Sequence, residues 1–325
     1  MARRYRFRQV DVFTDRPLAG NPLAVFPIAD GLTDAEMQAI GREMNLSETT
    51  FVLPPSEAGL AAGASYRLRI FTPGTELPFA GHPVIGTAWV LADEHRFPLV
   101  GPAVEVSQEL AIGVLPLAIE VRDGHPGAVQ MTQGTPHLLE ALDPADVPAL
   151  AAALGVSSDS LGWTDADGTS YDADRVPPRV VTTGLPYLVV PFRDLATLAA
   201  VRSEANAAAA AVARRCGSDS VALVAPGNAG AVPDADVHVR VLVDPAVGIQ
   251  EDPGTGSAAG PIAVYLGTLG GAQDERRQLI IEQGVEIGRP SRLEVEVSFY
   301  SEGTARSVRL TGRTVPVLEG WLELP

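Results

Sequence analysis

Cysteine is almost absent from this sequence, since Cys216 is the only one among 325 residues. A single cysteine excludes an internal disulfide and a thiolate metal cluster. Long apolar runs are also missing, and none approaches the ~20 residues that a membrane-spanning helix needs. The basic start at Met1–Phe7 has no apolar core after it, unlike a signal peptide. We therefore expect a cytoplasmic protein without a membrane partner.

Basic residues are few, with 24 Lys and Arg against 40 Asp and Glu, which gives a formal charge of -16. This balance repels phosphate backbones and anionic membrane surfaces, so it argues against a nucleic-acid partner. A small anionic substrate stays possible, because a local site can oppose the field of the whole chain.

Several cofactor and hydrolase motifs are missing as well. The chain has no GxGxxG after an early strand, no Walker loop, no HExxH and no GxSxG. Nicotinamide, nucleotide, zinc-protease and serine-hydrolase functions therefore lack their motifs. The histidines outside the candidate site have no metal-ligand spacing. We expect neither a cofactor nor a metal.

What is present indicates two domains of α+β class. The chain is longer than one hydrophobic core usually serves, and it carries many short strand-like runs with few helices. Thr33 and Glu36 have the spacing of a capping box that starts a helix. A longer helix is predicted from Leu195 to Arg215, closed by Gly217.

The sequence repeats itself across its middle. Arg69 to Pro73 is a strand-like run, and Arg240 to Pro245 resembles it. Each run is followed by four residues with identical mutual spacing: Glu76, Pro78, Gly81 and Ala88 in the first copy, and Glu251, Pro253, Gly256 and Ala263 in the second. The repeat predicts two similar domains that face each other across a cleft. The polar stretch 122–127 is the candidate boundary, which gives a first domain of residues 1–124 joined by 313–325 and a second of 125–312.

Both copies contain a turn that enters a helix, at Gly81-His82 and at Glu251–Gly260. Free N–H groups at such a helix start hold carboxylates or phosphates well, although ordinary turns and N-caps have the same composition. Glu48 lies where a helix gives way to a strand. Burial there would raise its pKa toward the range needed for proton transfer, whereas a solvated glutamate would have no such role. Position alone does not decide between the two.

These segments resemble the PhzF family of phenazine-biosynthesis enzymes. The similar blocks keep the family's order along nearly the whole chain: Asp11-Val12-Phe13, Gly20-Asn21-Pro22, Met44-Asn45-Leu46-Ser47-Glu48, Arg69-Ile70-Phe71-Thr72-Pro73, Glu76–Pro83, Glu251–Pro261 and Gln283–Ser291. The resemblance implies a diaminopimelate-epimerase-like fold of two similar domains. Each would be a curled, mostly antiparallel sheet around a central helix, with the active site between them. It also implies a homodimer.

The resemblance further implies an isomerase without a cofactor, of the trans-2,3-dihydro-3-hydroxyanthranilate isomerase type. Glu48 would move a proton between ring carbons of an unsaturated cyclic carboxylic acid. His82 and Asp252 would orient the substrate and assist this transfer. Ser257 and Gly256 would bind the substrate carboxylate, with Asn21 and Gly81 lining the pocket. Related epimerases use two cysteines, a mechanism that one cysteine excludes.

Two alternatives remain open from the sequence. The first is an epimerase of an amino or hydroxy acid, in which Asp252 serves as a second base opposite Glu48. The second is a catalytically silent ligand-binding protein of the same fold.

Overall fold

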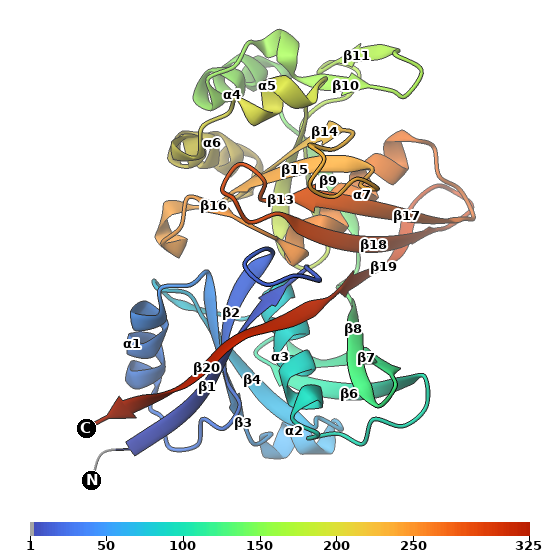
Figure 1. The fold of residues 1–325 in the computed structure, drawn as a ribbon. Helices are drawn as coiled ribbons and strands as arrows, with labels where there is room; N and C mark the ends of the chain where they lie inside the picture. Colours follow the sequence, from blue (N-terminus) through green and yellow to red (C-terminus); the bar gives the residue numbers. More distant parts are fainter. Residues whose placement is uncertain (1–2) are drawn as a thin grey trace. The chain divides into compact units, whose positions relative to one another are not determined.

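The structure is a computed structural model that describes residues 3–325. The chain forms two compact units, which are described separately below. Unit 1 comprises Met1–Thr132 and Thr311–Pro325, and unit 2 comprises Gln133–Leu310. Figure 1 shows the course of the chain through them.

Unit 1 is a mixed sheet with three helices. Its elements are β1 (Arg3–Val12), β2 (Asn21–Phe26), α1 (Asp34–Met44), β3 (Glu48–Leu53), α2 (Glu57–Ala61), β4 (Tyr66–Phe71), β5 (Glu76–Leu77), α3 (Gly81–Asp93), β6 (Ala103–Leu110), β7 (Gly113–Arg122), β8 (His125–Thr132) and the final strand β20 (Thr314–Leu324). The helix α3 is buried over almost its whole length and contacts β1, β2, β3, β7, β8 and β20. In Figure 1 it lies among these strands as their central helix.

Local sequence signals explain where α1 begins and ends. Thr33 accepts from the N–H of Glu36, and the Glu36 carboxylate accepts from the N–H of Thr33, so the predicted capping box is confirmed. Asn45 ends the helix in a left-handed conformation. The apolar face of α1 packs on the sheet through a cluster of aromatic and aliphatic side chains, which includes Phe26, Phe51 and Phe71.

Unit 2 is also a mixed sheet with helices. Its strands are β9 (His137–Ala141), β10 (Gly162–Thr164), β11 (Ser170–Asp172), β12 (Arg179–Thr182), β13 (Pro186–Pro191), β14 (Val221–Pro226), β15 (Val237–Leu242), β16 (Glu251–Asp252), β17 (Arg276–Gln283), β18 (Ser291–Phe299) and β19 (Ala305–Gly312), whose last two residues belong to unit 1. Its α-helices are α4 (Val147–Leu154), α5 (Leu195–Ala199), α6 (Asn206–Ala213) and α7 (Gly256–Leu269). Short 3-10 helices lie at Pro144–Asp146, Ser158–Ser160, Ser203–Ala205, Arg214–Cys216 and Pro245–Val247.

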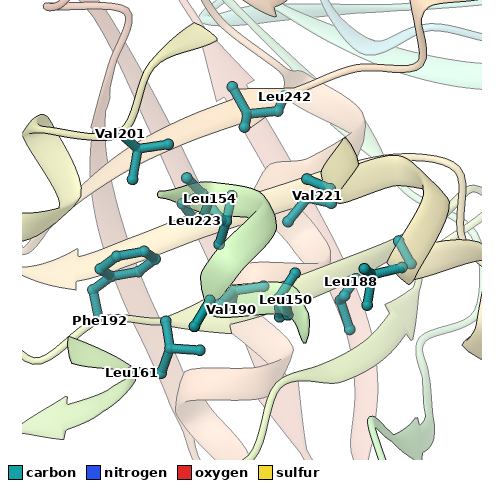
Figure 2. Close-up of a cluster of buried hydrophobic side chains, with 14 of the residues drawn as sticks. Leu150, Leu154, Leu161, Leu188, Val190, Phe192, Val201, Val221, Leu223 and Leu242 are labelled. Carbon is teal, nitrogen blue, oxygen red and sulfur yellow. The ribbon is translucent and has the colours of Figure 1, made fainter. Parts of the chain in front are cut away.

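The helices α4 to α6 cover one face of the unit 2 sheet. Their side chains form an apolar cluster with strand residues such as Leu188, Val190 and Leu223, all of them fully buried. Figure 2 shows Leu150 and Leu154 of α4 against this strand surface. The helix α7 contacts other strands of the unit, among them β12, β13 and β18.

The strand pairings of unit 2 follow the order of those in unit 1. In unit 1, β2 is parallel to β3, β3 antiparallel to β4, and β4 pairs with β5 antiparallel and β6 parallel. In unit 2, β13 is parallel to β14, β14 antiparallel to β15, and β15 pairs with β16 antiparallel and β17 parallel. The repeat seen in the spacing of four residues thus extends to the pairing of whole strands, with α3 and α7 in equivalent places.

Two details differ from the sequence analysis. The stretch 122–127 contains the turn of a hairpin rather than a domain boundary, because Arg122 of β7 pairs with His125 of β8, and both strands lie in unit 1. The single helix expected from Leu195 to Arg215 is wrong, since α5 and α6 are separate. The Arg240 guanidinium donates to the carbonyl oxygens of Leu198, Ala199 and Val201, which a continuous helix would need for its own N–H groups.

Over residues 3–325, none of the helices combines the length and the apolar character required to cross a bilayer.

Candidate active site

Three side chains meet where β2, β3 and α3 begin in unit 1. Asn21 is the first residue of β2, Glu48 is the first of β3, and His82 is the second of α3. The two strands run parallel, with Leu23 beside Glu48, so their first residues lie at the same edge of the sheet. Residues far apart in the sequence therefore form one polar cluster.

The chain reaches Asn21 through a turn that requires glycine. Gly20 has φ +67, and a Cβ on it would lie 2.3 Å from the carbonyl oxygen of Val12. An L side chain cannot occupy that space, because the obstacle is backbone. Gly20 thus fixes the direction in which Asn21 enters the site.

His82 is the centre of this cluster. Its Nδ1 lies 3.0 Å from Nδ2 of Asn21, and its Nε2 lies 3.4 Å from Oε2 of Glu48. The His82 side chain is 3% exposed and that of Glu48 12% exposed. Burial lowers the pKa of His82 to about 3, so the imidazole is neutral near pH 7. A neutral ring beside the carboxylate can donate one hydrogen bond without forming a fixed ion pair.

The start of α3 has no side-chain cap. Ala80 is its N-cap residue, Gly81 its first residue, and Pro83, which has no N–H, its third. Gly81 is buried at this start beside His82. The predicted residues Asn21, Glu48, Gly81 and His82 therefore lie within one small region of unit 1.

Unit 2 holds the remaining predicted residues at the start of α7. Asp252 ends β16, and its Oδ2 accepts from the hydroxyl of Thr255 at 2.6 Å. Gln283 donates from Nε2 to the Asp252 carbonyl and to the Thr255 hydroxyl oxygen, and its Oε1 accepts from the Thr255 N–H. These bonds hold the Asp252 carboxylate in one orientation inside a buried loop, in which all three residues are at most 7% exposed.

Thr255 does not act as an ordinary N-cap. It precedes α7, but its side chain makes no capping hydrogen bond, because the hydroxyl is committed to Asp252. The Thr255 side chain therefore does not cap the first turn of α7, and an uncapped helix start favours an anion. Ser257 and Gly256, the predicted carboxylate binders, lie in this turn.

Two further contacts shape the turn. The Ser257 hydroxyl lies 2.7 Å from the hydroxyl of Tyr187, and both residues are buried. The Gly256 carbonyl accepts from Nε2 of Gln133 at 2.7 Å. Gly284 has φ +82, and a Cβ there would lie 2.5 Å from the Pro253 carbonyl oxygen, so glycine lets the Gln283 segment approach the Asp252 loop.

Sequence reasoning missed three of these residues. Gln283 and Thr255 were only members of longer blocks of similarity, and Tyr187 was not singled out. The one sequence signal was the block Gln283–Ser291, which contains Gln283 and Gly284 but does not say what Gln283 contacts. Contacts between residues 28 or 70 positions apart depend on the folded sheet.

Over positions 3–325, no group of three or more His, Cys, Asp or Glu side chains is placed to hold a metal ion. His238, one of the histidines outside the candidate site, is fully buried between Glu282 and Glu286.

The comparisons with known proteins agree on one family. A family profile described as phenazine biosynthesis-like protein matches residues 10–320. The chain belongs to this family. The PhzF resemblance inferred from the sequence blocks is therefore confirmed.

Relatives match over nearly their whole length. Trans-2,3-dihydro-3-hydroxyanthranilate isomerase of Pseudomonas aeruginosa is 36% identical in an alignment of length 324 that covers 97% of this chain and 98% of that protein. An uncharacterized isomerase of Mesorhizobium japonicum is 36% identical over 312 residues, 96% of each chain. The predicted enzyme class, an isomerase of PhzF-like type, is confirmed by these relatives.

A solved structure gives the same fold. The Bacillus anthracis phenazine biosynthesis protein of the PhzF family superposes with a TM-score of 0.82 at 27% identity, covering 98% of this chain and 99% of that one. This PhzF chain therefore has the family's fold of mixed sheet and helices.

Proposed function

We propose that this protein isomerises an unsaturated cyclic carboxylic acid by moving a proton with Glu48, and that trans-2,3-dihydro-3-hydroxyanthranilate is its substrate. The observation that supports this most is the arrangement of Glu48 beside a buried, neutral His82. The full-length similarity to the Pseudomonas aeruginosa isomerase supports the choice of substrate.

In the proposed reaction Glu48 acts first as a base and then as an acid. Its carboxylate takes a proton from one ring carbon, and the electron pair of the broken C–H bond enters the conjugated system. The protonated Glu48 then gives the same proton to another ring carbon on the same face. The resulting enol tautomerises to a ketone, and Glu48 is again a carboxylate. One residue suffices because the conjugated system delocalises the developing charge.

The residues of unit 2 are proposed to bind and orient the same substrate. Ser257 and the N–H groups near Gly256 would bind its carboxylate, since α7 begins there without a side-chain cap. Asp252, oriented by Thr255, would accept hydrogen bonds from the amino or hydroxyl group. Binding of one substrate by residues of both units requires two domains of similar fold that enclose the substrate between them. The proposed partner is accordingly a small carboxylate, as the sequence predicts. The homodimer and the absence of a cofactor stay predictions.

The test is turnover in D2O followed by NMR. The parent and the Glu48→Gln variant are each incubated with trans-2,3-dihydro-3-hydroxyanthranilate, and we expect the parent to convert it and the variant to lose at least 100-fold in rate, on the order of a general-acid/base contribution. Glu43→Gln, which changes an exposed glutamate of α1, is the matched control and should behave like the parent.

Each other outcome has a definite meaning. If the parent leaves this compound unchanged, the proposed substrate is wrong. If the parent converts it and Glu48→Gln does so equally well, the role of Glu48 is wrong. If exchange at an amino- or hydroxy-acid α-carbon depends on both Glu48 and Asp252, the epimerase alternative replaces the proposal.

A further inference from the structure

The contact between Asn21 and His82 determines where the single proton of a neutral imidazole resides. Asn21 Nδ2 lies 3.0 Å from His82 Nδ1, in a pair with 0% and 3% exposure. An amide nitrogen can only donate, so the ring nitrogen facing it must accept. The remaining ring nitrogen, Nε2, then carries the hydrogen.

That hydrogen lies on the side of Glu48. Nε2 is 3.4 Å from Oε2 of Glu48, slightly beyond a good hydrogen bond, and a small movement of either side chain would close it. With the proton on Nε2, the ring donates toward the carboxylate. With the proton on Nδ1 instead, the lone pair of Nε2 would face a lone pair of Glu48 Oε2, and the two would repel.

We propose that Asn21 is a positioning residue that keeps His82 in the Nε2–H tautomer, so that the ring donates toward Glu48. Sequence reasoning placed Asn21 among residues that contact the substrate, whereas here its amide acts through His82. The catalytic consequence rests on the proposed function, but the tautomer itself does not.

The surroundings of His82 make the tautomer depend on Asn21. The ring is neutral because burial lowers its pKa to about 3, so near pH 7 it holds one hydrogen rather than two. In buried surroundings the choice between two neutral tautomers follows the hydrogen bonds that each ring nitrogen makes. The Gly20 turn and the β1–β2 pairing at Val12 fix the position of Asn21.

The direct test is a long-range 1H–15N NMR correlation of the full chain with 15N-labelled histidine near pH 7. The chain has five histidines, so His82→Gln identifies the signals of His82 by subtraction. We expect Nε2 to show the 15N chemical shift of a protonated ring nitrogen and Nδ1 that of an unprotonated one. The reverse pattern in the parent would overturn the proposal.

The second test replaces the hydrogen-bond donor of Asn21. In Asn21→Asp the side chain is nearly the same size but can only accept, so Nδ1 should become protonated. If His82 keeps an unprotonated Nδ1 in this variant, Asn21 does not set the tautomer and the proposal fails. Asn21→Ala removes the donor without adding charge, and we expect a mixture of the two tautomers.

A matched control separates this effect from the general cost of a buried Asp. Asn206 is a buried asparagine of unit 2 that donates from Nδ2 to the Val243 carbonyl oxygen. Asn206→Asp should leave the His82 signals unchanged. A change in them would show that the ring responds to unspecific destabilisation and would overturn the proposal.

Kinetics connect the tautomer to catalysis. We expect Asn21→Asp to lower kcat by about 10- to 100-fold with a much smaller change in KM, because a misdirected group slows proton transfer rather than binding. A parent without turnover would contradict the proposed function while the NMR result stands. A reversed tautomer with unchanged kcat would contradict only the catalytic consequence.

Discussion

Each unit buries one histidine beside a glutamate, and the pKa values of the two histidines are shifted in opposite directions. In unit 1, His82 has an amide on one side and a single carboxylate 3.4 Å away on the other, and burial lowers its pKa. In unit 2, His238 is 2.7 Å from Glu282 and 2.9 Å from Glu286. Burial opposes the charge on His238, but the hydrogen bonds to these carboxylates outweigh it and raise the pKa.

The difference shows what burial and partners do to the same side chain. Two carboxylates within hydrogen-bond distance stabilise the imidazolium, whereas an amide donor cannot. In unit 2 the histidine lies in a buried hydrogen-bond network with two carboxylates, which raise its pKa. Unit 1 keeps its histidine neutral at the place where a proton is proposed to move.

An arginine–glutamate pair occurs at equivalent places in both units. Removing its arginine should give the largest difference in the free energy of unfolding between the two units. Arg240 binds Glu251 through Nε and Nη2, and both side chains are at most 2% exposed. Arg69 binds Glu76 in the same way, but the Glu76 side chain is 40% exposed. We expect Arg240→Met to lower the free energy of unfolding by about 3–5 kcal/mol, because it leaves a buried carboxylate unpaired. Arg69→Met should cost about 1 kcal/mol or less.

Urea titrations of both variants measure this contrast. The double variant Arg240→Met with Glu251→Leu is the control, since removing both charges should recover most of the loss. Equal losses in Arg69→Met and Arg240→Met would show that the two pairs are not distinguished by burial.

The two histidines should give opposite pH dependences of stability. The folded pKa of His82 is lowered to about 3 from 6.5, so between these values the unfolded chain binds a proton that the folded chain does not. The difference in unfolding free energy between parent and His82→Gln should therefore fall as pH drops from 7 to 4.5, by up to about 1.4 kcal/mol per pH unit. His238 has a raised folded pKa, so its contribution is present below pH 6.5 and lost as pH rises through the folded value.

These slopes are obtained from urea midpoints at several pH values between 4.5 and 9. The difference between parent and His238→Gln should fall toward alkaline pH, opposite to that for His82→Gln. His125→Gln, which changes an exposed histidine at the start of β8, is the control for the loss of a histidine as such. Slopes of the same sign for His82 and His238 would contradict the opposite directions of the two pKa shifts.

Changes at the C-terminal ends of α3 and α7 should have the smallest effect on stability. Arg8 of β1 forms an ion pair at 2.8 Å with Asp93, the last of 13 residues of α3. The strand register makes Arg179 of β12 the equivalent of Arg8, and Thr268 is the equivalent of Asp93. Arg179 and Thr268 line a pocket of about 210 Å³.

We expect Thr268→Asp to supply the missing carboxylate and stabilise unit 2 by at most about 1 kcal/mol, because the helix dipole opposes it. Thermal unfolding at low and high salt measures the gain, which salt should reduce. Thr268→Asn is the uncharged control. An equal gain in stability in Thr268→Asn and Thr268→Asp would exclude an ion pair with Arg179.

The sequence predicted the repeat, which the strand pairings of the two units share, and it proposed site residues whose roles stay predictions, but it did not predict the contacts of those residues. Spacing among Glu, Pro, Gly and Ala was sufficient for the repeat because equivalent turns need the same residues at the same positions. The bond between Asn21 and His82 joins residues 61 positions apart, and it depends on how β2 meets α3.

The missed break between α5 and α6 has a similar cause. Alanine-rich sequence favours a continuous helix from Leu195, and local propensity contains no information about Arg240. The buried guanidinium takes the carbonyl groups at the end of α5, so a residue some 40 positions away ends the helix. Thr255 likewise has the composition of a cap, and only the fold directs its hydroxyl to Asp252.

The central claim is a division of labour, in which Glu48 of unit 1 moves the proton and the start of α7 in unit 2 binds the carboxylate. Steady-state kinetics of Glu48→Gln and Ser257→Ala with trans-2,3-dihydro-3-hydroxyanthranilate test it most directly. We predict that Glu48→Gln loses kcat by at least about 100-fold while still binding the substrate, and that Ser257→Ala raises KM by about 10-fold with kcat largely kept. A Glu48→Gln enzyme that keeps kcat within a few fold of the parent would contradict it.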